Sequence, residues 1–192
     1  MISTAPMEII YSGSADLERV RLALAAAFAT LPREEVRAIS AAEPHIGRET
    51  VQYVEDAMDV TQGKLGMGFS CGSSDMPALL MGNTLFGGSS NSKLFLNVRE
   101  KLSLCYYASS SYARSKKILT VSSGIEPKDY DRTLEEILRQ LRQVQQGQWE
   151  PWELEGARRT LIGGHLATLD DQGRQEEFWL GQAAAGLDTT IP

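Results

Sequence analysis

Two strand-like segments joined by a short loop restrict the fold of this chain more than any other feature. Residues 104–113 and 118–124 are together rich in tyrosine, serine and β-branched residues, and only the basic loop 114–117 separates them. A connection of that length joins two strands as an antiparallel hairpin. The pair therefore predicts antiparallel strands and argues against a doubly wound, parallel nucleotide-binding sheet.

Helical periodicity alternates with further strand-like segments along the chain. We predict strands at residues 7–11, 51–54 and 64–71. Apolar spacing and capping residues predict helices at 17–31, 76–86, 94–102, 127–147, from 151 onward, and at 174–185. Strands linked in pairs, with helices between the pairs, predict an α+β fold. It should be a two-layer sandwich in which helices pack on one face of a mixed, mainly antiparallel sheet.

The length of 192 residues suits a single domain. Within it we expect a strand–helix unit at residues 1–36 and a connector at 37–49, which contains Pro44 and Gly47. The main body should occupy residues 50–192. We also expect the chain to be a fragment of a longer protein.

Charge and cysteine content exclude several classes of function. The chain has 19 Lys and Arg against 25 Asp and Glu, a formal net charge of −6. This disfavours a nucleic-acid partner, because phosphates need an excess of cations. No apolar run is long enough for a membrane span. Cys71 and Cys105 form no C-x-x-C pair, and we interpret them as small hydrophobic residues of a reducing, cytoplasmic compartment, with a single bridge between them as the alternative.

The two histidines limit the metal chemistry of the chain. His45 and His165 lie 120 positions apart, whereas H-x-x-E-H and H-E-x-x-H zinc motifs place two histidines on one helical face. We therefore predict no metal site and no cofactor in this chain.

A turn formed by Gly87, Gly88, Ser89 and Ser90 first suggests a phosphate-binding loop. It lacks the G-x-x-x-x-G-K-S/T pattern and follows a predicted helix rather than a strand. Its minimum role is to end one helix and cap the next. An exposed turn of this kind can also offer backbone groups to an extended peptide, which makes the four residues candidates for substrate binding.

Arg99 and Tyr106 are the candidate catalytic side chains. Arg99 lies near the end of a predicted helix and Tyr106 at the start of the following strand. A helix-to-strand reversal of this length can bring the guanidinium and the phenol together as donors to a carbonyl oxygen, or to the oxyanion formed on attack. The alternative is structural: Arg99 paired with Glu100 or another nearby acid, and Tyr106 as a half-buried strand residue.

The segment that holds both side chains resembles a known signature. F-G-G-S-S at 86–90, S-K-L-F at 92–95 and R-E-K-L-S-L-C-Y at 99–106 resemble the pattern G-G-x-x-S-R/K-L-F/Y…R-E-K-x-x-L-x-Y. That pattern is typical of the pitrilysin/insulinase zinc peptidase family. More loosely, the opening strand and helix resemble the strand–helix unit of this family, and residues 153–157 resemble its E-L-x-x-A-K/R region.

The resemblance implies a partner and a site. Members of this family use two homologous halves, or two subunits, that close over a peptide, and only one half carries the inverted H-x-x-E-H zinc motif. This chain resembles the non-zinc half of such a bacterial peptidase. Arg99 and Tyr106 would then bind substrate backbone and support the transition state, and residues 87–90 would contact substrate. Zinc is expected in the partner half, in the same chain or a separate subunit, so this chain alone should be inactive toward peptides.

Two other functions stay open at this point. The fold could serve as a catalytically silent structural or assembly domain that has lost the chemistry. It could also be a regulatory peptide-binding module, in which an extended ligand adds to an exposed sheet edge. Substitution of Arg99 and Tyr106 in a reconstituted peptidase separates these functions from a role in catalysis.

Overall fold

The computed structural model describes residues 3–37, 47, 50–73 and 75–186. The chain divides into two compact units: the body, residues 43–165, and the terminal unit, residues 1–42 with 166–192. The single domain expected from the sequence, with a main body at residues 50–192, stays a prediction. Most of the expected connector, with Pro44 and His45, lies outside the described residues.

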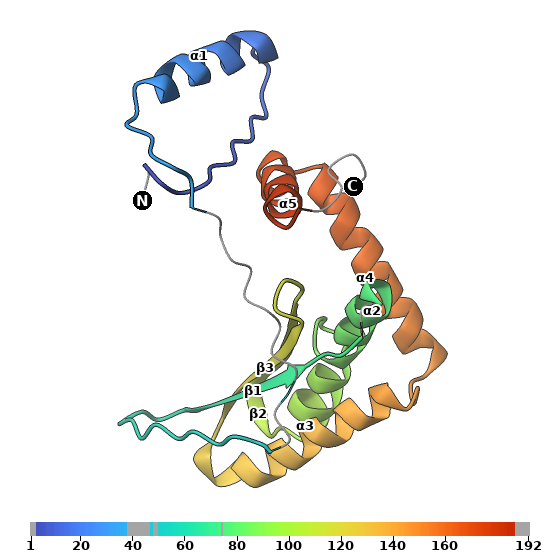
Figure 1. Cartoon of the computed structure of the whole chain (residues 1–192). Coiled ribbons are helices and arrows are strands. Elements are labelled where there is room, and N and C mark those ends of the chain that lie inside the picture. Colours follow the sequence, from blue (N-terminus) through green and yellow to red (C-terminus); the bar gives the residue numbers. More distant parts are fainter. Residues whose placement is uncertain (1–2, 38–46, 48–49, 74, 187–192) are drawn as a thin grey trace. The chain divides into compact units, whose positions relative to one another are not determined.

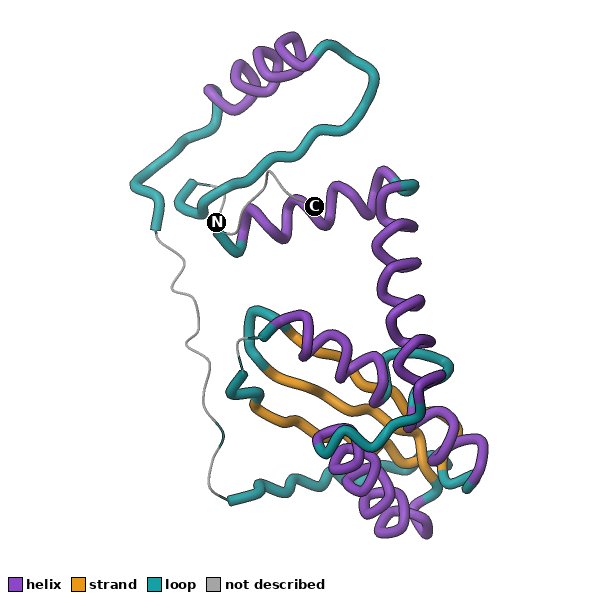
Figure 2. The backbone as a smooth tube through the Cα atoms, turned by 90° about the vertical axis from the view of Figure 1, so that its right-hand side faces the viewer, coloured by secondary structure: helices purple, strands orange, loops and turns teal. Residues whose placement is uncertain are grey.

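A three-stranded antiparallel sheet organises the body. Its strands are β1 (Gly63–Ser70), β2 (Cys105–Ala113) and β3 (Ile118–Ile125), in the order β1-β3-β2. β3 pairs with both neighbours, so the predicted hairpin of β2 and β3 is confirmed. Figure 2 shows the three strands side by side with helices packed along them. The predicted α+β class with a mainly antiparallel sheet is therefore confirmed.

One face of this sheet is mostly apolar and buried, and the other is exposed and includes many small residues. Leu65, Ala108 and Val121 lie on the inner face and are at most 7% exposed. On the outer face, Gly66 of β1 lies opposite Ser122 of β3, and both are exposed. Such alternation is typical of strands with one solvated face. The inner face packs against buried side chains from the helices: Phe86, Leu94, Val98 and Ile137.

The helical segments follow the predicted order (Figure 1). They are α2 (Met76–Phe86), η1 (Leu94–Lys101), η2 (Pro127–Asp129), α3 (Tyr130–Gln145) and α4 (Pro151–Leu169). The Asp75 carboxylate accepts the Ala78 N–H at 3.1 Å and begins α2 where the sequence indicated. η1 is wound as a π-helix, and η2 is a single 3-10 turn that leads into α3.

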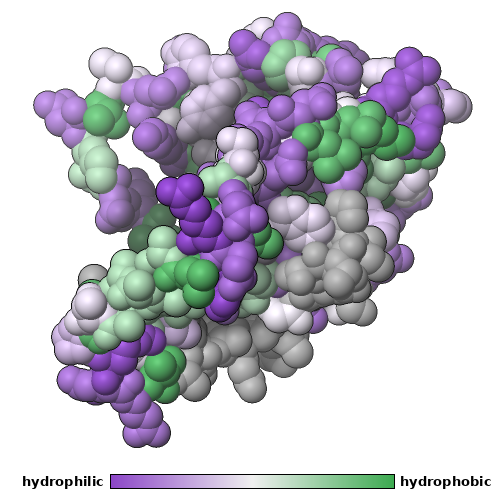
Figure 3. Space-filling view, turned by 90° about the horizontal axis from the view of Figure 1, so that it is seen from above, coloured by the Kyte–Doolittle hydropathy of each residue, from purple (hydrophilic) through white to green (hydrophobic). Residues whose placement is uncertain are grey.

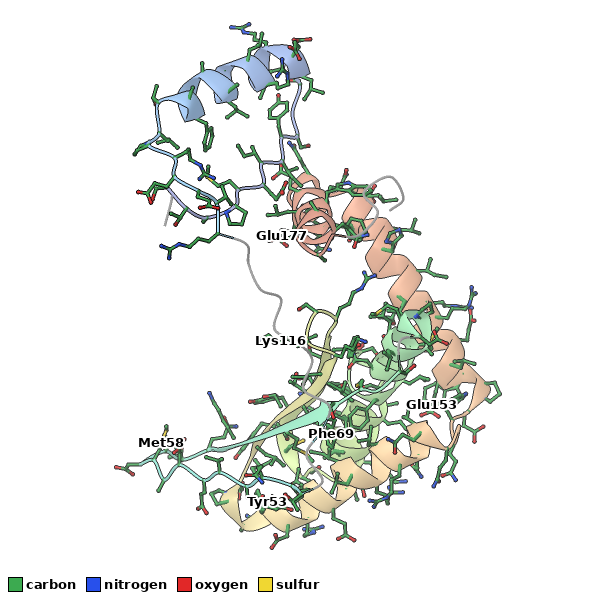
Figure 4. All side chains as sticks on the ribbon, in the orientation of Figure 1. Tyr53, Met58, Phe69, Lys116, Glu153 and Glu177 are labelled. Atoms are coloured by element: carbon green, nitrogen blue, oxygen red, sulfur yellow. The ribbon has the colours of Figure 1, made fainter. Side chains whose placement is uncertain are left out.

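A buried ion pair links the start of η1 to the start of α4. Lys93 Nζ lies 2.9 Å from Glu153 Oε1, and each side chain is 8% exposed. Glu153 also accepts the Glu150 N–H at 2.7 Å, so one carboxylate caps α4 and neutralises Lys93. Figure 4 labels Glu153 near this end of α4. An unpaired buried charge is costly, so the pair favours one placement of η1 relative to the start of α4.

The terminal unit contains α1 (Leu17–Ala29) and α5 (Gln172–Ala184), each with an aspartate N-cap. Gln172 Nε2 donates to the Ser12 carbonyl at 2.5 Å. Neither helix contains a buried residue. Figure 3 shows hydrophobic residues interspersed with hydrophilic ones on the surface in view. Across the described part of the chain, none of the helices combines the length and the apolar character needed to span a bilayer.

Two predicted strands are wrong. Residues 7–11 and 51–54 lie in irregular segments, and Tyr53 and Val54 are 76% and 89% exposed. A strand needs a neighbour to complete its backbone hydrogen bonds, and neither segment joins a ladder among the described residues. Figure 4 labels Tyr53 and Met58 on the irregular segment that precedes β1.

Candidate functional site

Arg99 is positioned by the last turns of η1. Leu94 and Val98 are 0% exposed and anchor this segment in the core. The Arg99 guanidinium carbon lies 4.8 Å from the centre of the Phe95 ring, and its Nη1 lies 3.6 Å from Glu100 Oε1. Stacking and surface pairing orient the guanidinium without burying it, since 41% of the Arg99 side chain is exposed.

A tight turn connects η1 to β2. Ser103 has a φ of 51°, in the left-handed region that non-glycine residues rarely adopt. The Leu104 N–H donates to the Val98 carbonyl at 3.1 Å and closes the turn. The π-helical winding before it is itself rare and is often found at functional sites. This turn is the reversal that the sequence indicated between Arg99 and Tyr106.

A β-bulge exposes Tyr106. Cys105 lies opposite Ile125 and Tyr107 opposite Gly124, which leaves Tyr106 as the extra residue in β2. A bulge interrupts the alternation of side chains between the two faces of a sheet. Accordingly, the consecutive residues Tyr106 and Tyr107 are both exposed, by 55% and 37%.

Glu126 and Lys128 complete the surroundings of the Tyr106 phenol. Tyr106 Oη donates to Glu126 Oε1 at 3.3 Å, and Lys128 Nζ lies 2.6 Å from Glu126 Oε2. The hydrogen bond and positive charge of Lys128, with a smaller effect of Tyr106, lower the pKa of Glu126. Pro127 favours the extended backbone of Glu126 (φ −81°, ψ 138°) at the end of β3. Glu126 was not among the residues predicted from the sequence, in which the Glu-Pro pair after a predicted strand was the available signal.

Arg99, Tyr106 and Glu126 share one surface depression with a volume of about 410 Å³. Its lining comprises Arg99, Glu100, Ser103, Leu104, Cys105, Tyr106, Glu126 and Asp129. The structure therefore brings the two predicted catalytic residues to one site, and their roles there stay predictions. A guanidinium and a phenol are hydrogen-bond donors suited to a carbonyl oxygen. The carboxylates beside them are paired with cations, as in the 3.5 Å contact between Arg132 and Asp129.

Cys105 lines the depression but is not set up as a nucleophile. Burial raises the pKa of its thiol, against smaller opposing effects of a hydrogen bond with Ser123 and the positive charge of Arg99. The reactive form of cysteine is the thiolate, so a raised pKa disfavours reaction at neutral pH. Cys71 and Cys105 are both free thiols, and the bridge considered for them is not formed.

The predicted substrate-binding turn at residues 87–90 does not line this depression. A Cβ on Gly87 would lie 2.6 Å from the backbone nitrogen of Ser110, and the Ser110 N–H donates to the Gly87 carbonyl at 3.0 Å. Close packing against β2 thus accounts for a glycine at this position. Gly88 and Ser90 are exposed, so substrate contact stays a prediction for the outer part of the turn.

Metal ligands are not gathered within the residues that the structure describes. No group of three or more His, Cys, Asp and Glu side chains among them is arranged to hold an ion. His165 lies exposed on α4. The described side chains at the depression thus offer hydrogen-bond donors and charges.

Comparison with known proteins shows the family of this chain. Residues 1–161 match the family described as "Peptidase M16 inactive domain". Over 191 residues the chain is 35% identical to the "Probable inactive metalloprotease YmfF" of Bacillus subtilis (strain 168), a match that covers 96% of this chain and 44% of the relative. The chain therefore spans less than half the length of this curated relative.

Solved structures share the fold. A conserved protein from Enterococcus faecalis V583 is 27% identical with a TM-score of 0.67, over 93% of this chain and 42% of that one. A protease from Helicobacter pylori is 17% identical with a TM-score of 0.71, over 90% of this chain and 44% of that one. The family match and the 35% identical relative confirm the family resemblance stated for residues 86–106.

Proposed function

Because the chain belongs to the peptidase M16 inactive-domain family, we propose that it is the non-zinc half of a two-part zinc peptidase. In this role it binds an extended peptide and supports the reaction at a catalytic half that carries H-x-x-E-H. The observation that carries the proposal is the placement of Arg99 and Tyr106, from two different elements, in the lining of one depression. The proposed partners are the peptide and a zinc-carrying half, either in the same chain or in a separate subunit.

Arg99 and Tyr106 would act as donors to the peptide backbone. A guanidinium offers five N–H groups and a phenol offers one O–H, and both side chains are partly exposed here. Donors aimed at a carbonyl oxygen bind it more tightly as negative charge develops, which is how they would support the transition state. The partner half would supply the zinc and the general base, so this chain alone should not hydrolyse peptides.

Two further parts of the proposal concern the turn and the location. The exposed Gly88 and Ser90 would offer backbone groups to the same extended peptide. A cytoplasmic location is supported by the two free thiols, Cys71 and Cys105, because disulfides are rare in reducing compartments.

Reconstitution with an H-x-x-E-H half tests the proposal. Arg99→Ala and Tyr106→Phe should each lower kcat/KM by a factor that corresponds to about 1–3 kcal/mol, the value of a hydrogen bond to a charged group. Lys101→Ala, which removes another exposed cation of η1, and Tyr107→Phe, which removes the neighbouring exposed hydroxyl of β2, are matched controls. The controls should leave kcat/KM unchanged. Equal turnover in all four variants would contradict the proposal.

A catalytically silent assembly domain is the second candidate function. Arg99 and Tyr106 already have partners within the chain, Glu100 and Glu126, as structural residues would. A relative that is 35% identical is also described as a probable inactive metalloprotease. Under this alternative the same variants leave turnover unchanged, and removal of the chain dissociates the assembly, which sedimentation of the reconstituted complex would detect.

A further inference from the structure

We propose that Glu126 is a positioning residue: it holds the Tyr106 hydroxyl in the peptide-free chain, and a peptide carbonyl must replace it as the acceptor. This inference rests on the proposed function, because it concerns the same depression. It adds a residue that lies outside the signature at residues 86–106 and that follows a different strand, β3. The consequence is that Glu126 sets how readily Tyr106 becomes available to a peptide.

The Tyr106 hydroxyl can donate its hydrogen bond to one acceptor at a time. Tyr106 Oη donates to Glu126 Oε1 at 3.3 Å, and a phenol carries a single O–H. A hydroxyl that donates to Glu126 cannot donate to a carbonyl oxygen in the same conformation. Both residues line the depression, and Tyr106 is 55% exposed, so an incoming oxygen can reach the hydroxyl.

Lys128 weakens Glu126 as a competitor of the peptide carbonyl for the Tyr106 hydroxyl. Its Nζ lies 2.6 Å from Oε2 of Glu126, the carboxylate oxygen that Tyr106 does not use. The ammonium draws negative charge toward itself, and the same contact lowers the pKa of the Glu126 carboxyl. A carboxylate that is neutralised in this way is a weaker acceptor, so the hydroxyl is released more easily.

The backbone, rather than burial, places the two residues together. Tyr106 is the extra residue of the bulge, directly after the pair formed by Cys105 and Ile125. Glu126 follows Ile125 and is restricted by Pro127. The bulge at the start of β2 and the proline after β3 thus meet at the same end of the hairpin, which explains why neither strand alone indicates the contact.

Carbon-13 NMR of the tyrosine Cζ atoms, recorded on the full chain, tests the hydrogen bond without any peptide. The Tyr106 resonance is identified by its loss in Tyr106→Phe. Glu126→Ala should shift this resonance. Glu100→Gln is the matched control, because Glu100 lines the same depression but pairs with Arg99, and it should leave the resonance in place. An unmoved resonance in Glu126→Ala overturns the inference.

Peptide binding by the same variants tests the competition. With a capped, uncharged, unstructured peptide as the probe, Glu126→Ala should tighten binding by about two- to tenfold, the value of one hydrogen bond. Lys128→Ala should weaken binding, because a Glu126 without its cation holds the hydroxyl more firmly. Both changes should vanish in a Tyr106→Phe background, as a double-mutant cycle requires of coupled residues. Changes that persist in that background overturn the inference, since Glu126 would then act through charge alone.

The two measurements separate this inference from the proposed function. Peptide binding with an unmoved Tyr106 resonance overturns the role of Glu126 alone. A shifted resonance without peptide binding by any variant overturns the proposed function. It also overturns the statement that a peptide carbonyl replaces Glu126 as the acceptor. A shifted resonance with opposite effects of Glu126→Ala and Lys128→Ala on binding supports both.

Discussion

The two ends of the signature at residues 86–106 differ in what surrounds them. At the first end, Gly87 is closed in by atoms of Ser110 and Leu94, and Lys93 is only 6% exposed. At the second end, Arg99 keeps 41% of its side chain exposed and Tyr106 is 55% exposed, and the partners of both lie at the surface. Packing explains the residue types at the first end but not at the second. The difference shows which part of a family pattern maintains the fold and which part needs an explanation in terms of function.

The largest effect should come from breaking the buried ion pair at the first end. Glu153→Ala leaves the Lys93 ammonium without a partner and the Glu150 N–H without its acceptor. We expect a loss of about 3–5 kcal/mol in the free energy of unfolding, measured by urea denaturation of the full chain. Glu155→Ala is the control on the same helix, because Glu155 pairs with Arg158 at the surface, and it should change stability little. Equal losses in the two variants would mean that Lys93 is solvated.

Gly87→Ala should have the next largest effect. The added Cβ would lie 2.6 Å from the Ser110 nitrogen and 2.7 Å from Cδ1 of Leu94, and backbone cannot give way cheaply. We expect a destabilisation of about 1–3 kcal/mol, visible as a lower Tm. At Gly66 a Cβ meets no atom within 4 Å, so Gly66→Ala should be neutral or stabilising. A Gly66→Ala variant as unstable as Gly87→Ala would remove the contrast between close-packed and open positions.

Smaller stability effects are expected at the second end of the signature. Arg99→Ala and Tyr106→Phe should change the free energy of unfolding by no more than about 0.5 kcal/mol, because exposed pairs contribute little. Urea denaturation alongside the kinetic assay checks this. Lost activity with retained stability would separate function from folding at these two residues, whereas a large loss of stability would make them structural.

The smallest expected effect is a loss of stability at acid pH, and it involves hydrogen bonds that link α3 to η1. Glu136 accepts from Gln140 at 2.6 Å, and Gln140 accepts from Asn97 of η1 at 3.0 Å. Burial acts to raise the pKa of Glu136, but hydrogen bonds from Arg139 and Gln140 outweigh it and bring the pKa below its usual value of 4.5. Since the folded-state pKa is the lower one, this contribution to stability is complete above pH 4.5 and is lost as pH falls through the folded-state pKa.

Glu136→Gln should therefore reduce the fall in stability on acidification. Urea denaturation at about pH 6 and about pH 3 compares the variant with the unaltered chain. The difference between the two pH values should be smaller in the variant. An equal or larger difference would show that Glu136 does not contribute to the acid sensitivity.

The helices and strands that depend on residues nearby in the sequence were the predictable part of the fold. The hairpin of β2 and β3, the start of α2 at Asp75 and the start of α4 at Pro151 depend on loop length, caps and proline preference within a few residues. The strands expected at residues 7–11 and 51–54 failed because a strand also depends on a partner that is distant in sequence.

The candidate site was only half predictable. Arg99 and Tyr106 were predicted from the helix-to-strand reversal and from the family resemblance; both line one depression, and their roles there stay predictions. Glu126 could not be found by spacing, since its contact joins the residue that follows β3 to Tyr106 in β2. Ordinary strand alternation assigns a side chain to one face of a sheet, and one inserted residue changes that assignment.

By itself, the sequence determined the α+β class of the body, the separation of the two histidines and the family to which Arg99 and Tyr106 point. These follow from local periodicity, composition and a linear pattern. Only the tertiary structure decided that Gly87 is required by packing and that Tyr106 donates to Glu126. The physical reason is that cross-strand register, bulges and close backbone contacts depend on residues far apart in the chain, which no local pattern encodes.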